Sequence, residues 1–217
     1  MTTNPVNVTV FGASGKIGRH VVDQLLAGDH HVTAYVRNPD KVSLQHPKLT
    51  VVQGELDNRA AIARAIQDAD AVISALGPTL KRSGTGSPVA DGTRNIVAAM
   101  QTADVRRYIG LATPAIADER DRPTLKGKVL RTMPRLAFPN ALTELVGMSD
   151  AVRSSDLDWT IARITSPNDK AAKGTTRAGF LGRDKVGSAM TRADIAAFLV
   201  AQLADDTYLH SAPAVSN

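Results

Sequence analysis

Cysteine is absent from the 217 residues of the sequence. Its absence excludes disulfide bonds, thiolate metal sites and a cysteine nucleophile. The five histidines do not pair with carboxylates at the spacing of a metal site, so we predict no bound metal. A chain without cysteine suits a reducing compartment, and we expect a cytoplasmic protein.

Aromatic residues and long apolar runs are also scarce. The sequence has one tryptophan, three tyrosines and four phenylalanines, although apolar residues make up 43% of it. We therefore expect a core built mostly from alanine, valine, leucine and isoleucine. No apolar run approaches the ~18 residues of a membrane-spanning helix, and the N-terminus lacks the basic and apolar pattern of a signal peptide. We expect no membrane partner.

A strong charge of one sign is missing as well. Lysine and arginine number 26 against 21 aspartates and glutamates, which gives a net charge of +5. The basic residues are scattered, and no run of five or six like charges occurs. This mild excess suits a site for phosphates, and we expect no nucleic-acid partner.

The sequence does contain a regular alternation of apolar segments. The predicted strands cover residues 6–11, 31–36, 49–53, 71–76, 107–112 and 159–163. The predicted helices cover residues 16–26, 59–66, 90–101 and 192–203. Alternating strands and helices predict an α/β fold, a doubly wound parallel sheet of the Rossmann type with helices on both faces. The length predicts a single domain over residues 1–217.

Three further segments lie between or after these elements. Residues 125–153 are predicted to be helical in pieces, because Pro134 and Pro139 interrupt the pattern. We expect this region to supply a small C-terminal substrate cap. Residues 165–187 are polar and contain glycine, which predicts a loop. Residues 83–87, with the sequence SGTGS, are expected to form a flexible lid.

Three glycines follow the first predicted strand in the sequence GASGKIG, at Gly12, Gly15 and Gly18. Residues without a side chain let the backbone approach a diphosphate closely, and the free amides at a helix start attract negative charge. The strand before these glycines and the helix after them are typical of a dinucleotide-binding loop. The alternative is a tight turn that binds no ligand.

The residue after the second predicted strand indicates which dinucleotide is bound. An acidic residue here would bind the 2′-hydroxyl of the adenine ribose in NAD. The sequence has Arg37 instead, and a guanidinium forms paired, charge-assisted hydrogen bonds to a 2′-phosphate. We therefore predict NADP(H) as the cofactor. Lys41 is placed to assist, or it is an ordinary surface lysine.

Several stretches together resemble a known family. They are VFGASGKIGRHVV, AYVRNPDK, VVQGELDN, DAVISALGP, DGTRNIVAAM, RRYIGLAT, LDWTIARI and TRADIA. The set resembles the atypical short-chain dehydrogenase/reductase proteins, which carry an NAD(P)H-binding Rossmann domain. Within them it is most similar to the biliverdin IX-beta reductase and NADH-flavin reductase group. The resemblance covers residues 6 to about 197.

The resemblance implies a set of cofactor-binding residues. They are Gly12, Ser14, Gly15, Lys16, Ile17, Gly18, Arg37, Glu55, Leu56, Ala75, Leu76, Gly77 and Thr113. The residues up to Gly18 correspond to the pyrophosphate loop. Glu55 and Leu56 correspond to positions beside adenine, although the family more often has aspartate where Glu55 stands. Residues 75–77 correspond to the passage of the nicotinamide ribose, and Thr113 to a hydroxyl that faces the nicotinamide.

The sequence also departs from the wider superfamily, whose members mostly reduce carbonyls with a Tyr-x-x-x-Lys pair. The lysine lowers the tyrosine pKa so that the phenol can exchange a proton with the substrate. The tyrosines here are Tyr35, Tyr108 and Tyr208, and none has a lysine four residues later. The register of the family places this pair near Ala141 and Leu145, which are both apolar.

Two main readings of the function follow. One is an NADPH-dependent oxidoreductase that transfers hydride to a conjugated acceptor such as a flavin, a quinone or a tetrapyrrole, because solvent can then supply the proton. The other is a non-catalytic, NADP(H)-sensing regulatory protein. A weaker third reading is reduction of an unusual carbonyl by Thr113 with water. We expect a small planar acceptor as the partner, and a monomer or weak homodimer.

Side chains other than the missing pair offer few substitutes for an acid. The Thr113 hydroxyl is the catalytic candidate, and it would orient a carbonyl or else bond to the nearby backbone. Glu144 and Asp150 lie in the helical region before the last predicted strand and face either the pocket or solvent. We expect both carboxylates to face solvent.

Overall fold

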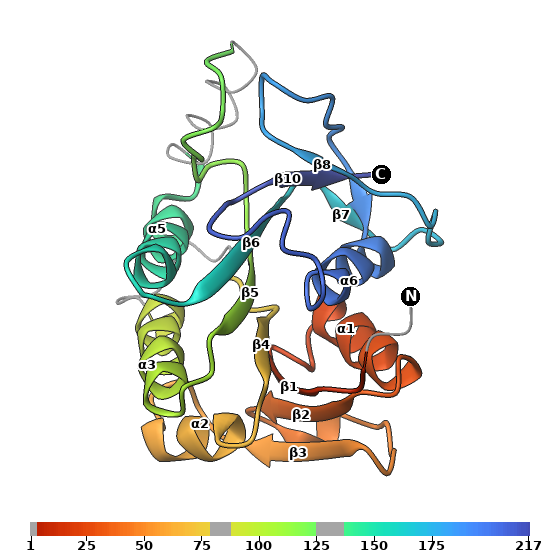
Figure 1. Cartoon of the computed structure of the whole chain (residues 1–217), viewed down its shortest axis with the longest axis vertical. Helices are drawn as coiled ribbons and strands as arrows, with labels where there is room; N and C mark the ends of the chain where they lie inside the picture. Colours follow the sequence, from red (N-terminus) through yellow and green to blue (C-terminus); the bar gives the residue numbers. More distant parts are fainter. Residues whose placement is uncertain (1–3, 79–87, 125–136) are drawn as a thin grey trace.

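The computed structural model describes residues 4–78, 88–124 and 137–217. Its strands are β1 (Asn7–Phe11), β2 (His31–Val36), β3 (Leu49–Gln53), β4 (Ala71–Ser74), β5 (Arg107–Ala112), β6 (Asp158–Ile164), β7 (Pro167–Asn168), β8 (Arg177–Gly179), β9 (Met190–Thr191) and β10 (Ala214–Ser216). Eight of them form a sheet in the order β3-β2-β1-β4-β5-β6-β10-β8, and β7 pairs with β9. Figure 1 shows this sheet crossing the molecule from β3 at one end to β8 at the other.

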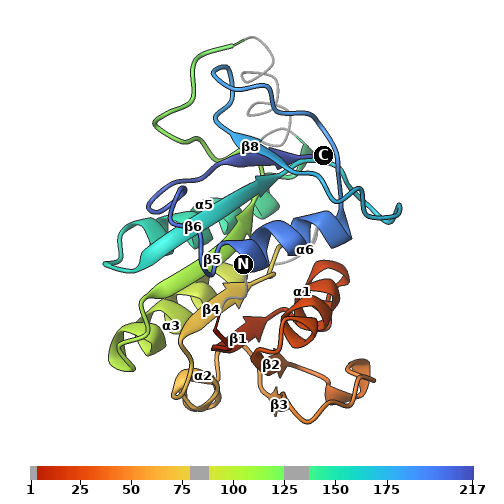
Figure 2. The ribbon, with the colours of Figure 1, turned by 45° about the vertical axis from the view of Figure 1, so that its right-hand side comes forward.

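Helices cover both faces of the sheet. They are α1 (Lys16–Ala27), α2 (Arg59–Ile66), α3 (Pro88–Thr102), α5 (Pro139–Arg153) and α6 (Arg192–Ala201). Helices α1 and α6 lie on one face, and α2, α3 and α5 lie on the other (Figures 1 and 2). The arrangement confirms the predicted doubly wound, Rossmann-like fold.

The order of the strands reverses at β1. Val8 of β1 lies opposite Val32 of β2 on one side and opposite Ala71 of β4 on the other, and both pairs are parallel. Strands β3, β5, β6 and β10 continue the parallel arrangement, whereas β8 is antiparallel to β10. Since parallel strands end at the same edge, the segments that follow them emerge together. Folds of this kind bind ligands in the crevice at that edge, where the strand order reverses.

The two faces of the sheet each carry an apolar core. Val21 and Leu25 of α1 and Ile195 of α6 are fully buried in one apolar cluster that includes side chains of β1 and β2. Ile62 of α2 and Ile96 of α3 are fully buried on the opposite face. Small and branched aliphatic side chains dominate both clusters, as the composition predicts, and their burial is the main force that fixes the layers. Among the described residues, no helix has the length and apolar character needed to cross a membrane.

The predicted elements up to β6 are found with small shifts at their ends. Strand β4 ends at Ser74, two residues early, because its partner β1 ends at Phe11, directly opposite Ser74. The prediction of a loop over residues 165–187 is wrong in part, since β7 and β8 lie within it. Strand β10 was not predicted. These short strands are defined by partners far along the chain, so their own sequence gives little signal.

Residues 139–153, in the region expected to supply a substrate cap, do not form the separate helical pieces that the prolines predicted. Residues 139–153 form one continuous helix, α5, which packs beside α3 on a face of the sheet. Pro139 does not interrupt this helix but begins it, because a proline in the first turn needs no hydrogen-bond donor. Residues 125–136, and residues 83–87 of the predicted lid, lie outside the described residues.

The prediction that Glu144 faces solvent is wrong, because its carboxylate is buried. Its Oε2 atom accepts hydrogen bonds from the backbone N–H groups of Val89, at 3.1 Å, and of Ala90, at 2.7 Å. These amides lie in the first turn of α3, whose positive dipole end favours a carboxylate. Glu144 therefore joins α5 to the start of α3. Asp150, in contrast, is exposed as expected.

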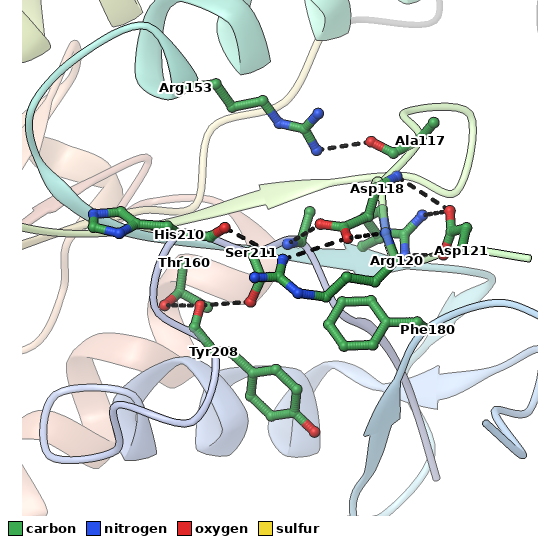
Figure 3. Close-up of polar contacts among 12 residues, drawn as sticks. Ala117, Asp118, Arg120, Asp121, Arg153, Thr160, Phe180, Tyr208, His210 and Ser211 are labelled. Atoms are coloured by element: carbon green, nitrogen blue, oxygen red, sulfur yellow. Dashed lines mark hydrogen bonds and ion pairs between the residues drawn. The ribbon is translucent and has the colours of Figure 1, made fainter. Parts of the chain in front are cut away.

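A buried ion pair connects β6 to the segment that follows β5. Arg163 of β6 and Asp121 are both almost completely buried, with 2.6 Å between Nη1 and Oδ2 and 2.8 Å between Nη2 and Oδ1. Arg163 also donates to the carbonyl of Ile116, at 3.1 Å, and Asp121 accepts from the amide of Leu181, at 2.9 Å. Figure 3 shows Asp121 beside Asp118, which donates its amide to the Asp121 carboxylate. The ion pair thus ties strand β6 to the segment after β5 and to the segment after β8.

We predict that Asp121→Asn destabilises the protein by about 3–5 kcal/mol, because the buried Arg163 guanidinium loses its counter-charge. Urea denaturation at neutral pH measures this loss. The control is Asp156→Asn, since Asp156 forms an exposed pair with Arg106 that solvent screens, and its replacement should have a much smaller effect. Equal losses in the two variants would contradict the structural role of the Asp121 pair.

The same carboxylate predicts a dependence of stability on acid. Burial by itself would raise the pKa of Asp121, but hydrogen bonds from Arg163 and from backbone amides lower it below its ordinary value. The unfolded chain therefore binds the proton more readily, at a pKa of about 3.9. The stabilisation by Asp121 is complete above that pH and is lost as the pH falls through the lower folded pKa. Denaturation midpoints measured between neutral and acid pH should fall less steeply in Asp121→Asn than in the unmodified protein.

Candidate functional site

The predicted cofactor-binding residues gather at the carboxyl edge of the sheet. They are Gly12, Ser14, Gly15, Lys16, Ile17 and Gly18 after β1, Arg37 after β2, Glu55 and Leu56 after β3, Ala75, Leu76 and Gly77 after β4, and Thr113 after β5. Since β3, β2, β1, β4 and β5 are neighbours in this order, these residues follow the edge from one end of the strand set to the other. Because the strand order reverses at β1, the glycine loop lies at the centre of this edge.

The glycines of this loop are required by close backbone contacts. Gly12 has a φ of +75°, and a Cβ atom there would lie 2.9 Å from the carbonyl carbon of Ala75. At Gly18, a Cβ atom would lie 2.1 Å from the carbonyl oxygen of Gly12. The amide of Gly15 donates to that same oxygen, at 2.9 Å, and closes the turn. A side chain at Gly18 would push α1 away from the end of β1, and a side chain at Gly12 would clash with the backbone that follows β4.

At the start of α1, no side chain of the helix offsets the positive end of the helix dipole. Its N-cap is Gly15, no side chain caps it, and its first turn contains no acidic residue. In contrast, Asn58 caps α2 through the amide of Ala61, at 3.0 Å, and Thr191 caps α6 through the amide of Asp194, at 3.1 Å. An uncapped N-terminus beside a glycine turn is suited to bind an anionic group. The loop therefore fits the diphosphate of a dinucleotide.

Arg37 follows the last residue of β2 and is exposed. The next residue, Asn38, accepts a hydrogen bond from the amide of Asp40, at 2.9 Å, and so caps the short turn Pro39–Lys41. This turn also brings Lys41 to the surface after β2. A guanidinium at this position is available to a phosphate that approaches the carboxyl edge.

Glu55 and Leu56, predicted to lie beside adenine, are held in place by their backbones. The Tyr35 hydroxyl donates to the carbonyl of Glu55, at 2.7 Å, and Asn95 of α3 donates to the carbonyl of Leu56, at 2.9 Å. Burial, the largest influence, raises the pKa of Tyr35, so the phenol stays protonated and able to donate. Asn95 had no predicted role, although it lies in the stretch DGTRNIVAAM. Both contacts shape the loop between β3 and α2.

Thr113 lies directly after β5 and is half-buried. Its Oγ1 atom accepts from the amide of Ala115, at 3.4 Å, so the hydroxyl does contact the backbone, as one of the two readings expected. The distance is long, and the bond uses the oxygen as acceptor, which leaves the hydroxyl hydrogen able to donate. The carbonyl of Thr113 accepts from Ile116, at 3.0 Å, and this turn leads into the loop that the Arg163 pair anchors.

The role of Arg163 was missed by the sequence analysis, although the stretch LDWTIARI contains it. Figure 3 shows further contacts of the same loop: Arg153 donates to the carbonyl of Ala117, at 2.8 Å, and the Arg120 guanidinium lies over the ring of Phe180, 5.4 Å from its centroid. A buried arginine gives no signal in sequence, because charged residues usually lie at the surface. Within the described ranges, no three His, Asp or Glu side chains are arranged to hold a metal ion.

These features define a class of protein. A strand order of 3-2-1-4-5-6, a glycine turn at the reversal and an uncapped helix start together form the dinucleotide-binding site of a Rossmann protein. The chain belongs to the NAD(P)H-binding family, whose model matches residues 12–206. The predicted resemblance and cofactor class are thereby confirmed.

Individual relatives agree with this assignment. The chain is 30% identical over 211 residues to the UPF0659 protein YMR090W of Saccharomyces cerevisiae, covering 92% of this chain and 88% of the yeast protein. It is 32% identical over 126 residues to a 3-beta-hydroxysteroid dehydrogenase of Mycolicibacterium neoaurum, covering 54% of this chain. That match spans 34% of the dehydrogenase, about a third of its length.

Solved structures share the fold. A short-chain dehydrogenase/reductase from Veillonella parvula, in complex with NADP, has a TM-score of 0.76 at 21% identity and covers 98% of this chain and 94% of its own. ChuY, an anaerobilin reductase from Escherichia coli O157:H7, has a TM-score of 0.77 at 21% identity and covers 97% of this chain and 96% of its own.

We predict that Arg37→Asp raises the dissociation constant for NADPH by about 10- to 100-fold, because a charge-assisted pair is replaced by repulsion. The dissociation constant for NADH should change by less than about threefold, since NADH has no 2′-phosphate. Calorimetry with both nucleotides measures the difference. The control is Arg64→Asp, because Arg64 lines a cavity with Asn7 and His31 at the opposite, amino edge. Equal losses for both nucleotides in Arg37→Asp would show that Arg37 does not bind the 2′-phosphate.

Proposed function

We propose that the protein is an NADPH-dependent reductase that transfers hydride to a conjugated planar acceptor, such as a flavin, a quinone or a tetrapyrrole. It would act as a single domain in the cytoplasm. The observation that carries the proposal is the combination of the glycine loop at the start of α1 with a sequence that contains no Tyr-x-x-x-Lys pair. A conjugated acceptor is the substrate class that such a site suits, because its reduction needs no strong protein acid.

The helix where the family register places the acid pair supports this view. That helix is α5, and the two positions are Ala141, which is buried, and Leu145, which is half-buried. The tyrosines elsewhere are poor substitutes. Tyr35 donates to the carbonyl of Glu55, and complete burial raises the pKa of Tyr108 to about 12. Tyr208 packs edge-on against Phe180, beside α6.

The chain's own residues would bind and orient rather than exchange protons. The amides at the start of α1 and the glycine turn would hold the diphosphate, and Arg37 the 2′-phosphate. When bound, NADPH supplies the hydride, that is, two electrons and one hydrogen nucleus, and water supplies the proton that completes the two-electron reduction. The Thr113 hydroxyl would donate a hydrogen bond to the acceptor and set its distance.

The likeness to ChuY adds support for one acceptor class. ChuY is described as an anaerobilin reductase, and its fold matches nearly the whole of both chains. A bilin is a conjugated linear tetrapyrrole, so a reductase of this fold with such a substrate supports the proposal of a large planar acceptor. The tetrapyrrole is therefore included among the acceptors to be tested.

The decisive experiment follows the absorbance of reduced nicotinamide in mixtures of the protein, NADPH and one acceptor: FMN, a quinone or biliverdin. We expect protein-dependent loss of NADPH with at least one acceptor, and formation of the reduced acceptor in equal amount. Measurable binding of NADPH without turnover of any acceptor would contradict the proposal and favour the alternative of an NADP(H)-sensing protein.

We predict that Thr113→Val slows turnover by about 2- to 10-fold, the contribution of one neutral hydrogen bond. The dissociation constant for NADPH should change by less than the rate does, because the substitution keeps the shape of the side chain. Steady-state rates and calorimetry separate the two effects. Thr102→Val is the matched control, since Thr102 donates to the carbonyl of Ala98 at the far end of α3. An unchanged rate in Thr113→Val would reduce Thr113 to a structural role.

A further inference from the structure

A carboxylate from a distant segment contacts the lysine of the glycine loop. Lys16 is the first residue of α1, and its Nζ atom lies 3.3 Å from Oδ2 of Asp169. Asp169 comes 153 residues later, immediately after β7. The family resemblance counts Lys16 among the residues for the pyrophosphate and gives no role to Asp169. The structure thus places the carboxylate of Asp169 beside Lys16, a residue that is expected to bind the pyrophosphate.

The position of Asp169 is fixed by its other partner. Arg192 donates from Nη1 to Oδ1 of Asp169, at 2.5 Å, and its side chain is mostly buried. The two residues follow the parallel pair of Asn168 in β7 and Thr191 in β9, so the ladder itself brings them together. Burial by itself would raise the pKa of Asp169, but hydrogen bonds from Arg192 and Lys16 lower it below the ordinary value. The carboxylate is therefore ionised at neutral pH.

The path of the chain also holds this carboxylate near α1. Ser166, between β6 and β7, has a φ of 42°, an uncommon conformation for a residue with a side chain. The β7–β9 ladder continues directly into α6, and α6 packs beside α1, where Gln24 donates to the carbonyl of Ala193 at 2.9 Å. Asp169 is thus attached to the helix neighbouring α1, not carried on a free loop.

We propose that Asp169 competes with the nucleotide diphosphate for Lys16, and that it thereby weakens cofactor binding and speeds cofactor release. A diphosphate at the start of α1 gains from the positive charge of Lys16, and Asp169 partly neutralises that charge. Arg192 keeps the carboxylate in place while Lys16 exchanges partners. The inference rests on NAD(P)H binding at the glycine loop and not on the identity of the acceptor.

The contact between Lys16 and Asp169 is exposed to solvent, which suits an exchange of Lys16 between Asp169 and a phosphate. The side chains of Lys16 and Asp169 are 72% and 63% exposed, so the ion pair is weak and easily opened. Lys16 can therefore turn to a phosphate without large rearrangement. A reductase gains from such a balance, because release of the oxidised nucleotide limits turnover in many enzymes.

The test compares Asp169→Asn with the unmodified protein. We expect the dissociation constant for NADPH to fall by about three- to tenfold at low ionic strength, with most of the change in the dissociation rate. The gain should shrink as salt is added, because the charges are exposed. Asp150→Asn, which removes an exposed carboxylate from α5, serves as the matched control and should change nothing. Thermal unfolding verifies that each variant is folded.

A double-mutant cycle with Lys16→Met identifies the route of the effect. If Asp169 acts through Lys16, its replacement should improve binding by less than about twofold when Lys16 is already absent. An unchanged or raised dissociation constant in Asp169→Asn, or a full gain in the Lys16→Met background, would overturn the inference. Absence of turnover with every acceptor would contradict only the proposed reduction. The inference about Asp169 would be unaffected, because nucleotide binding is measured without an acceptor.

Discussion

The close contact between the end of β1 and the start of α1 is the constraint on which the rest depends. The carbonyl of Gly12 lies where a Cβ atom of Gly18 would be, so the helix can approach the strand only without side chains at these positions. This contact leaves the first amides of α1 uncapped and directed toward the carboxyl edge of the sheet. The anion site is therefore a consequence of backbone packing. The charged residues around it adjust affinity and selectivity but do not create it.

Charged side chains of two kinds lie around this anion site. Arg37 adds an exposed cation after β2, where it can select a phosphorylated ribose. Asp169 offsets a second cation, Lys16, and is itself held by Arg192. A site for a charged cofactor that must leave again after each turnover benefits from both effects, because tight binding of substrate and product alike does not raise the rate. In the two proposals made for this site, selectivity and release are set by different residues.

Buried charges have a different function in the same molecule. Arg163 and Asp121 hold the loop after β5, which begins at Thr113, and Glu144 holds the first turn of α3. Each of these contacts fixes backbone at the carboxyl edge, without touching the expected path of the cofactor. The sequence suggested none of them. A pairing between residues 42 or 55 positions apart depends on how elements pack, and residue type alone would place such charges at the surface.

The sequence by itself determined the alternation of strands and helices, the glycine turn and the arginine after β2, because apolar periodicity and glycine spacing act locally along the chain. These features identify the fold class and the cofactor class. Only the tertiary structure decided that Glu144 is buried, that residues 139–153 form one helix beside α3, that β7 to β10 exist, and that Asp169 contacts Lys16. Each of these depends on a partner distant in sequence, and such contacts are fixed by packing of the whole domain rather than by local preference.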